Sequence, residues 1–362
     1  MRDQDYMNLA INVAKAGLGQ TNPNPVVGAV VVKDGRVVGI GAHLKAGEAH
    51  AEVYAIHMAR EKAENATIYV TLEPCSHHGK TPPCADLLIK NKVKRVVVAT
   101  TDPNPLVAGK GIKKLREAGI EVEVGICKAS ADALNPVFYH YLDKKIPYVT
   151  LKSATTLDGK IATVTGESKW ITGDAARLDV HLYRSIHDGI LVGVNTVLAD
   201  DPSLTTRLPD GTGKNPIRII LDTSLRTPLE AKVVNDGNAP TWIIVGNQVN
   251  REKLNDFQDK PGVRVLQLNE QTLSVNSVLT LLGQEGIASL FVEGGAEING
   301  SFLKEKAINQ VITYIAPKLI GGKLAPTSIG GSGIETLGEA LQVVIKSVEQ
   351  LGDDVKIVSE PI

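Results

Sequence analysis

The chain has 362 residues, of which 43% are hydrophobic and 22% are charged, and its formal net charge at pH 7 is −1. This length favours two domains, and the composition is that of a globular protein with a full hydrophobic core. A net charge so close to zero does not supply the basic field that binds a nucleic-acid backbone. An aromatic content of 4% is also low for a surface that stacks single-stranded bases.

The first 19 residues mix charges with apolar residues at helical spacing, which predicts an amphipathic helix and not a signal peptide. No apolar run approaches the roughly 18 residues of a membrane span, so we expect no membrane association. Cys75, Cys84 and Cys127 form an odd set in a long chain, which argues against a disulfide framework. A reducing, cytoplasmic location is therefore expected.

Strands and helices are predicted to alternate through the first part of the chain. Strands at 26–32 and 37–41 flank a turn at Asp34-Gly35. Further strands are predicted at 66–73, 93–101 and 120–125, and helices at about 50–62, 84–91 and 110–119. Such alternation predicts an α/β domain with some parallel strand pairing. Prolines and charges interrupt the pattern at 135–147, so the expected domains are 1–145 and 146–362.

The second domain has the same α/β style without an internal repeat. A helix is predicted over 172–188, with Thr172 or Asp174 as its N-cap. Strands are predicted at 147–154, 189–196, 216–223, 241–247, 263–268, 288–295 and 309–317. The Gly-Gly pair at 294–295 follows a strand and precedes a helix. There the backbone can approach a phosphate, although a Gly-Gly pair taken alone is more often a simple turn.

One imidazole and two thiols occur at positions that suit a zinc site. Catalytic zinc takes three protein ligands and leaves a position for a water, which loses a proton near neutral pH. His50, Cys75 and Cys84 supply such a set, and two thiolates roughly neutralise the dication. Residues two apart on a helix point about 200° apart, so His50 and Glu52 converge only beyond the helix's N-terminal end. Cys84 follows two prolines, which predicts that a second helix N-terminus faces the metal and favours thiolate.

Each of these residues also has an ordinary explanation. His-x-Glu sequences are common, and the two cysteines are explained as buried small hydrophobes or as a structural metal pair. The combination nevertheless follows the H-x-E…P-C-x-x-C pattern of zinc deaminases, in which the glutamate moves protons and is not a ligand. Here eight residues separate Cys75 from Cys84, where the pattern has two, which lengthens the loop at the mouth of the site.

Motifs along nearly the whole chain resemble the bifunctional riboflavin-biosynthesis deaminase–reductase family. They are TNPNPVVGAVVV, HAE, TLEPCSHHGKTPPC, TDPNPLVAGKG, TLDGKIAT, SKWITG, VGVNTVLADDPSLTTR and FVEGGAEINGSF. The resemblance implies a cytidine-deaminase-like α/β/α sandwich followed by a dihydrofolate-reductase-like α/β domain. It also implies assembly as a homo-oligomer, a dimer or a tetramer.

The resemblance implies two reactions. The first is zinc-dependent hydrolytic deamination of 2,5-diamino-6-ribosylamino-4(3H)-pyrimidinone 5′-phosphate, in which Glu52 passes a proton from water to the departing amine. The second is NADPH-dependent reduction of the ribosyl group to ribityl, with Lys152 and Asp200 as candidates for stabilising the open imine form of the sugar.

The resemblance also assigns binding residues. Substrate positions in the first domain are Asn24, His43, His77, Lys80, Asp102 and Asn104. Substrate positions in the second domain are Ser168, Arg184, Leu204, Arg207 and Glu293. Cofactor positions are Ala154, Trp170, Thr196, Asp200, Thr223 and the run Gly295, Ala296, Glu297, Ile298, Asn299, Gly300 and Ser301. Lys80, Arg184 and Arg207 are the expected partners of phosphate, because cationic side chains form charge-assisted hydrogen bonds with it.

Two other hypotheses remain open at this point. One is a nucleobase or transfer-RNA deaminase with an accessory binding domain, which the near-zero charge and low aromatic content disfavour. The other is a structural zinc protein without activity. That hypothesis requires a fourth protein ligand, for which Cys127 or His77 would have to serve.

Overall fold

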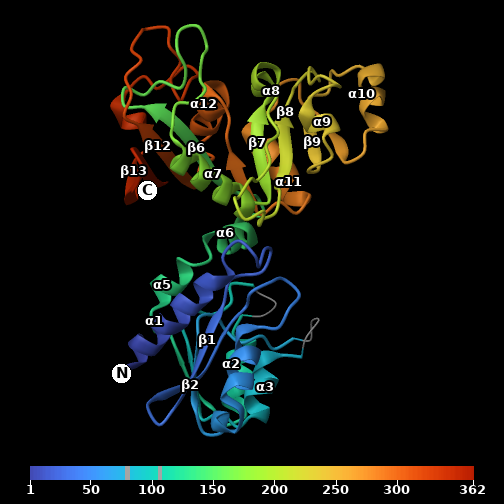
Figure 1. The fold of residues 1–362 in the computed structure, drawn as a ribbon. Helices are drawn as coiled ribbons and strands as arrows, with labels where there is room; N and C mark the ends of the chain where they lie inside the picture. Colours follow the sequence, from blue (N-terminus) through green and yellow to red (C-terminus); the bar gives the residue numbers. More distant parts are fainter. Residues whose placement is uncertain (78–81, 105–107) are drawn as a thin grey trace. The chain divides into compact units, whose positions relative to one another are not determined.

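The protein is described by a computed structural model that covers residues 1–77, 82–104 and 108–362. The chain forms two compact units, Met1–Lys144 (unit 1) and Lys145–Ile362 (unit 2), shown in Figure 1. Within the described residues, no helix combines the length and the apolar character that crossing a membrane requires.

Unit 1 is built on a five-stranded sheet with the order β2-β1-β3-β4-β5. Its strands are β1 (Gly28–Lys33), β2 (Arg36–Ala42), β3 (Thr67–Val70), β4 (Arg95–Val98) and β5 (Glu121–Val124). β1 pairs antiparallel with β2 and β3, whereas β3, β4 and β5 are parallel. All five strands were predicted. The predicted turn is confirmed as well, since Asp34 and Gly35 have φ values of 50° and 73° between β1 and β2.

Helices cover both faces of this sheet, so unit 1 has the predicted α/β/α layers (Figure 1). On one face lie α1 (Asp3–Ala14) and α5 (Lys128–Asp132); on the other lie α2 (Ala51–Ala59), α3 (Cys84–Lys90) and α4 (Lys110–Glu117). Successive strand residues point to opposite faces. Val30 therefore packs under α1, while Val31 packs under α2.

The prolines and charges at 135–147, where the predicted alternation of strands and helices breaks off, do not prevent regular structure. This segment contains α6 (Pro136–Lys144). Pro136 is its first residue, where a missing N–H leaves no helical hydrogen bond unmade. The buried Asn135 amide exchanges hydrogen bonds with the backbone N–H and C=O of Val26, at 2.8 and 3.0 Å, and so holds the start of the helix.

Unit 2 has a nine-stranded sheet with the order β10-β9-β8-β7-β11-β6-β12-β14-β13. Its strands are β6 (Tyr148–Thr156), β7 (Gly189–Gly193), β8 (Ile217–Leu221), β9 (Thr241–Val245), β10 (Val263–Gln267), β11 (Ser289–Val292), β12 (Gln310–Ala316), β13 (Val343–Leu351) and β14 (Asp354–Pro361). The strands from β10 to β12 are parallel, and β14 and β13 close the far edge in antiparallel pairing. The seven parallel strands were predicted, but the hairpin of β13 and β14 was not.

The parallel strands of unit 2 are covered on both faces, as such sheets require. The helices are α7 (Asp174–Ile186), α8 (Val194–Asp200), α9 (Lys232–Asn235), α10 (Arg251–Gln258), α11 (Val275–Gln284) and α12 (Ala296–Lys304). Leu191 packs with Leu282 and Phe302 from α11 and α12, whereas its neighbour Ile190 packs in a cluster with Phe257 from α10.

The predicted N-cap of α7 is wrong. The cap is Gly173, and its N–H donates to Oδ2 of Asp354 at 2.7 Å, a residue 181 positions away. A carboxylate from β14 thus holds the residue at which α7 begins, and no side chain of the described residues caps the N–H groups of its first turn.

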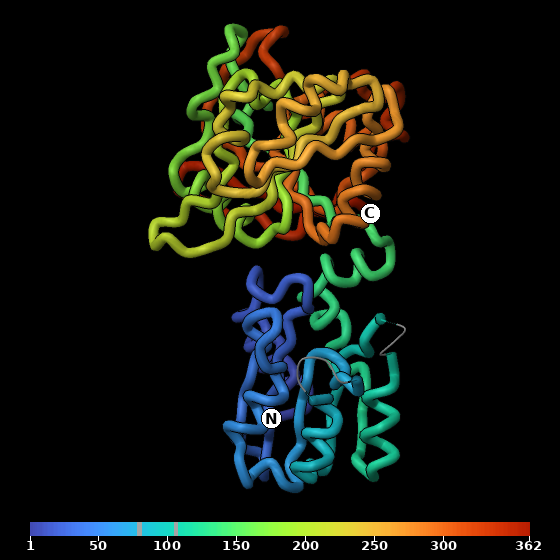
Figure 2. Tube along the Cα trace, turned by 90° about the vertical axis from the view of Figure 1, so that its right-hand side faces the viewer, coloured from blue at the N-terminus to red at the C-terminus, as the bar shows by residue number. Residues whose placement is uncertain are grey.

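Two segments follow the adjacent parallel strands β6 and β12 and run side by side beyond the sheet, as Figure 2 shows. Lys160 and Thr327 form an isolated β-bridge, and the N–H of Ile161 donates to the carbonyl of Pro326 at 3.0 Å. This edge of the sheet is where α/β folds place ligands.

Candidate active sites

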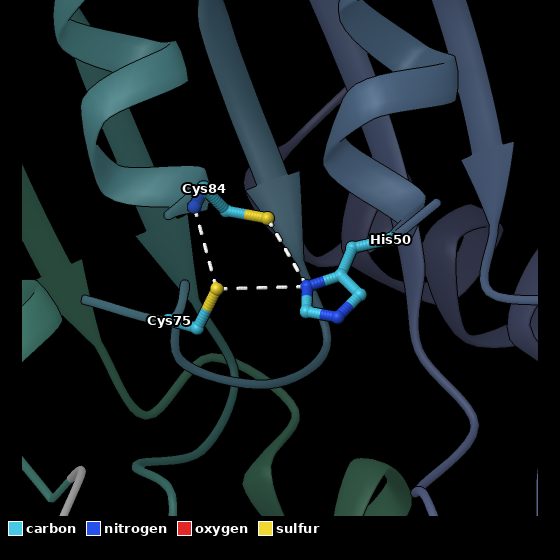
Figure 3. Close-up of side chains that lie close together, drawn as sticks. All are labelled: His50, Cys75 and Cys84. Atoms are coloured by element: carbon cyan, nitrogen blue, oxygen red, sulfur yellow. Dashed lines mark hydrogen bonds between the residues drawn. The ribbon is translucent and has the colours of Figure 1, made fainter. Parts of the chain in front are cut away.

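His50, Cys75 and Cys84 converge from three separate elements (Figure 3). His50 is the N-cap of α2, Cys84 is the first residue of α3, and Cys75 lies in the turn after β3. His50 Nδ1 is 3.3 Å from Cys84 Sγ and 3.5 Å from Cys75 Sγ, and the three ligand atoms all lie within 4.8 Å of one another. Both helix starts agree with the prediction to within one residue.

The spacing of these atoms fits tetrahedral zinc. With Zn–N of about 2.0 Å and Zn–S of about 2.3 Å, nitrogen and sulfur ligands of one ion lie roughly 3.5 Å apart. The two measured N···S distances, 3.3 and 3.5 Å, agree with this value. His50, Cys75 and Cys84 are therefore able to hold zinc, and the set of one imidazole and two thiols is one that zinc prefers.

The surroundings favour a thiolate at Cys75. Hydrogen bonds from the Cys84 thiol and from His50 lower the pKa of Cys75 to about 4. The backbone N–H of Cys84, at the start of α3, also donates to Cys75 Sγ at 3.3 Å. Donating its proton to Cys75 raises the pKa of Cys84, and a dication between the ligand atoms would favour the thiolate of both.

Glu52 lies beside this cluster in the first turn of α2 and is 3% exposed. Burial, followed by the negative charge of Cys75, raises the pKa of Glu52 to about 7. A carboxyl group that gains and loses its proton near neutral pH is suited to general acid–base work. Its place next to the ligands, rather than among them, is the arrangement that the His-x-Glu spacing predicted.

Asn24 and His43, two predicted substrate residues, contact each other. His43 Nδ1 lies 3.1 Å from the carbonyl oxygen of Ala49, which only accepts, so Nδ1 carries the proton. His43 Nε2 is then an acceptor for Asn24 Nδ2 at 3.3 Å. This hydrogen bond holds the Asn24 amide in one orientation and so fixes the direction of its carbonyl oxygen. The His43 ring also packs edge-on to that of His50, with centroids 5.4 Å apart.

The other predicted substrate residues of unit 1 are placed differently. Asp102 is partly buried, and its Oδ1 accepts the N–H of Asn104 at 2.8 Å. Burial raises the pKa of Asp102, although the charge of His77 acts in the opposite direction. His77 itself is exposed, and Lys80 lies outside the described residues.

A buried charge cluster lies in unit 2, where Glu293 directly follows β11 and Lys152 lies in the middle of β6. Glu293 accepts two hydrogen bonds from Arg184, at 2.6 and 3.0 Å, and its Oε2 is 3.6 Å from Lys152 Nζ. Burial alone would raise the pKa of Glu293, but the charges of Arg184 and Lys152 outweigh it and hold the pKa at about 2. The carboxylate is therefore ionised and fixes both cations.

His181 belongs to this cluster and was missed in the sequence. Its Nδ1 accepts the backbone N–H of Arg207 at 3.3 Å. Burial, and then the positive charges of Arg184 and Arg207, lower the pKa of His181 to about 4, so it is neutral at pH 7. His181 precedes Arg184 by three residues on α7, a spacing that places both on one face of the helix and could have indicated its role.

The charge balance of this cluster suits an anion. Lys152, Arg184 and Arg207 carry three positive charges and Glu293 one negative charge, which leaves a surplus of two. A phosphate dianion matches that surplus. Leu204, also predicted to bind substrate, is 4% exposed with a φ of 51°, and Ser168 is partly buried.

Lys152 and Asp200 were both candidates for stabilising the open imine form of the sugar, and they belong to different ion pairs. Lys152 pairs with Glu293, whereas Asp200 Oδ1 is 3.5 Å from Lys169 Nζ. Lys169 was not predicted as a site residue. The next residue, Trp170, is 62% exposed, and the guanidinium of Arg177 lies 4.8 Å from its ring centroid.

The predicted cofactor residues gather at the carboxyl ends of parallel strands. Ala154 is on β6, Thr196 is in the first turn of α8 after β7, and Thr223 follows β8. Gly295 is the N-cap of α12 after β11 and has no side chain to satisfy the first N–H groups of that helix. Free backbone donors at a helix N-terminus fit a phosphate of a dinucleotide.

Two residues of the predicted run 295–301 have a packing role. Asn299 is 2% exposed, and its Nδ2 donates to the carbonyl of Ser328 at 2.8 Å. A Cβ on Gly300 would lie 2.4 Å from the carbonyl oxygen of Gly330, so this glycine allows the close contact between α12 and that segment.

Comparisons with known proteins identify a family for each of the two units. Residues 1–100 match the cytidine and deoxycytidylate deaminase zinc-binding region, and residues 147–357 match the RibD C-terminal domain. The riboflavin biosynthesis protein RibD of Bacillus amyloliquefaciens is 52% identical over 99% of this chain and 96% of its own length. The chain belongs to the RibD family. Its Escherichia coli relative, also named riboflavin biosynthesis protein RibD, is 42% identical over 98% of each protein.

Solved structures of RibD-family proteins have the same fold. Acinetobacter baumannii RibD superposes with a TM-score of 0.88 at 42% identity, covering 99% of both chains. A Thermotoga maritima protein described as a diaminohydroxyphosphoribosylaminopyrimidine deaminase/5-amino-6-(5-phosphoribosylamino)uracil reductase gives 0.86 at 39% identity, again over 99% of both. The chain is thus a two-activity enzyme of riboflavin biosynthesis, with a zinc-binding deaminase region and a reductase domain of the NADPH-dependent type.

Proposed function

We propose that residues 1–145 deaminate 2,5-diamino-6-ribosylamino-4(3H)-pyrimidinone 5′-phosphate and that residues 146–362 reduce the ribosyl group of the product to ribityl. The observation that carries this proposal is the triad of His50, Cys75 and Cys84 with buried Glu52 beside it. The Thermotoga maritima relative is named for both a deaminase and a reductase activity, which supports it. The division into units at Lys144 and Lys145 supports the domain limits.

In the deamination, zinc supplies the Lewis acidity that makes a water nucleophilic near neutral pH. Glu52 takes a proton from that water and returns it to the amine that leaves the ring. Asn24, whose amide nitrogen is engaged by His43, presents its oxygen to the pyrimidine. Asp102 is the second polar anchor of the base, and water enters as the amine departs as ammonia.

In the reduction, NADPH supplies the hydride that reaches C1′ of the sugar. The sugar accepts hydride only in its open imine form, and Lys152 is the cation that stabilises this form and supplies the proton to nitrogen. Glu293 holds Lys152 in place, while Arg207 and Arg184 attract the 5′-phosphate. Asp200 and Trp170 belong to the NADPH side of the site, together with Thr196, Thr223 and the N-terminus of α12.

We further propose that the chain acts in the cytoplasm and assembles as a homo-oligomer. All three cysteines are free thiols, which is typical of a reducing compartment. β13 is an edge strand with exposed apolar side chains, and the exposed fractions of Val343, Val344, Ile345 and Val348 are 42, 43, 58 and 63%. Such a strand is a ready pairing surface for a second copy. The net charge of −1 disfavours a nucleic-acid substrate.

The proposal is tested by supplying the diaminopyrimidinone phosphate and NADPH to the full chain, with ammonia and NADPH absorbance followed together. Both signals are expected, with ammonia released first. Removing zinc with a chelator should abolish ammonia release, because water activation is lost. NADPH oxidation should persist when the deaminated product is supplied directly. Ammonia release that is unaffected in metal-free protein, or the absence of both signals, would contradict the proposal.

A further inference from the structure

Glu73 has a buried carboxylate that none of the roles above uses. It lies two residues before the metal-binding Cys75 and is 4% exposed. Among the residues that the structure describes, four backbone N–H groups donate hydrogen bonds to its oxygens. Oε1 accepts from Gly111 at 2.9 Å and Ile112 at 3.2 Å, and Oε2 accepts from Gly109 at 2.9 Å and Asp102 at 3.2 Å.

These donors belong to two parts of the site. Gly109 is the N-cap of α4, and Gly111 and Ile112 are in its first turn. Gly109 has no side chain, so Glu73 supplies the cap, and a carboxylate is favoured there by the helix dipole. The fourth donor is the N–H of Asp102, whose side chain in turn accepts the N–H of Asn104.

The same residue is tied to the metal-binding turn. The backbone N–H of Glu73 donates to the carbonyl of Thr100 at 3.0 Å, which joins the segment after β3 to the segment after the neighbouring strand β4. α4 also packs closely against Pro74, the residue between Glu73 and Cys75. A Cβ on Gly111 would lie only 1.9 Å from the carbonyl oxygen of Pro74, so this contact needs the glycine. One side chain thus connects the turn that carries Cys75 to the segment that carries Asp102.

We propose that Glu73 is a positioning residue of the deaminase reaction. It holds Asp102 and Asn104 at a fixed separation from Cys75, so that the pyrimidine meets the metal and Glu52 in one orientation. This inference rests on the proposed deaminase function, because Asp102 and Asn104 matter only if they bind the base. If Glu73 were instead only a helix cap, its loss would lower stability and leave substrate affinity unchanged.

The test is the Glu73→Gln variant of the full chain. Glutamine keeps the length and volume of the side chain, but it replaces one acceptor oxygen with an NH2 group that faces two N–H donors. We expect at least a tenfold rise in KM for the diaminopyrimidinone phosphate and a smaller change in kcat. Zinc should remain at one ion per chain, and the reductase rate on deaminated substrate should not change.

Two further variants make the result specific. Glu117 lies at the other end of α4, where its side chain is 65% exposed and its Oε1 is 3.8 Å from Lys113 Nζ. The Glu117→Gln variant should therefore leave KM unchanged. Gly111→Ala pushes α4 away from Pro74 without altering a charge, and should raise KM in the same direction. If Glu73→Gln does not fold, Gly111→Ala decides the question alone.

An unchanged KM in Glu73→Gln would overturn the inference, and so would loss of zinc, because Glu73 would then serve the metal site itself. A wild-type chain that releases no ammonia would instead refute the proposed function.

Discussion

The Glu52→Gln variant is expected to lose deaminase turnover by about 10²- to 10⁴-fold, the usual contribution of a general acid–base group. Glutamine has nearly the same shape as glutamate, but it neither accepts a proton from water nor returns one to the amine. Glu52 is 3% exposed, and its pKa of about 7 suits both steps of the proposed mechanism. The measurement is kcat for ammonia release.

The zinc content of the Glu52→Gln variant distinguishes a catalytic role of Glu52 from a role in binding the metal. Because Glu52 is not a ligand, Glu52→Gln should bind one zinc ion per chain, and its reductase rate on deaminated substrate should equal that of the wild type. Glu61→Gln changes an exposed acid in the turn after α2 and serves as the control. A variant that keeps full turnover would remove Glu52 from the mechanism, and one that loses zinc would make it part of the metal site.

The Glu293→Gln variant is expected to lower reductase kcat/KM by on the order of 10²-fold, because displacing a catalytic group such as Lys152 by about 1 Å has an effect of this size. Glu293 is the shared partner of Arg184 and Lys152. Removing its charge leaves two cations repelling each other in a buried site, and should reduce the free energy of unfolding by about 3–5 kcal/mol. Deaminase activity in the same chain should be unaffected.

The pH dependence of stability gives a second readout. The pKa of Glu293 is lowered from 4.5 to about 2, so its stabilisation is fully present above about pH 4.5 and is lost as the pH falls towards 2. This lowering of the pKa corresponds to about 3 kcal/mol of stabilisation. The difference in unfolding free energy between the wild type and Glu293→Gln should therefore be constant at neutral pH and shrink below pH 4.5.

Glu285→Gln is the matched control for these measurements. It removes a carboxylate from a single ion pair with Arg264, at 2.8 Å near the surface, and should change stability by about 0–1 kcal/mol. Equal stability losses in Glu285→Gln and Glu293→Gln, or a difference that does not depend on pH, would contradict the assigned role of Glu293.

The metal cluster was predictable because its information is local. Each ligand lies at the end of a predicted element: the histidine comes before a helix, one cysteine follows a strand, and the other follows two prolines that begin a helix. One imidazole and two thiols are a ligand set that zinc prefers. The parallel strands were predictable for a similar reason, since runs such as Ile217–Leu221 are rich in β-branched residues and buried on both faces.

Features that depend on distant partners were not predictable. β13 has no alternation of buried and exposed residues, and its pairing with β14 is what defines it. The N-cap residue of α7, Gly173, donates its N–H to Asp354, 181 residues away. Glu73 acts through backbone N–H groups, which carry no residue-specific signal in a sequence. Pro136 begins a helix instead of interrupting one, and only tertiary contacts distinguish the two roles.

The most direct test of the zinc-centred account is the X-ray absorption spectrum of zinc in the purified, active chain. The geometry of His50, Cys75 and Cys84 predicts two sulfur ligands at about 2.3 Å and two nitrogen or oxygen ligands at about 2.0–2.1 Å, one of them from exchangeable water. Three sulfur ligands, four ligands that all come from the protein, or full deaminase activity in a zinc-free chain would contradict it.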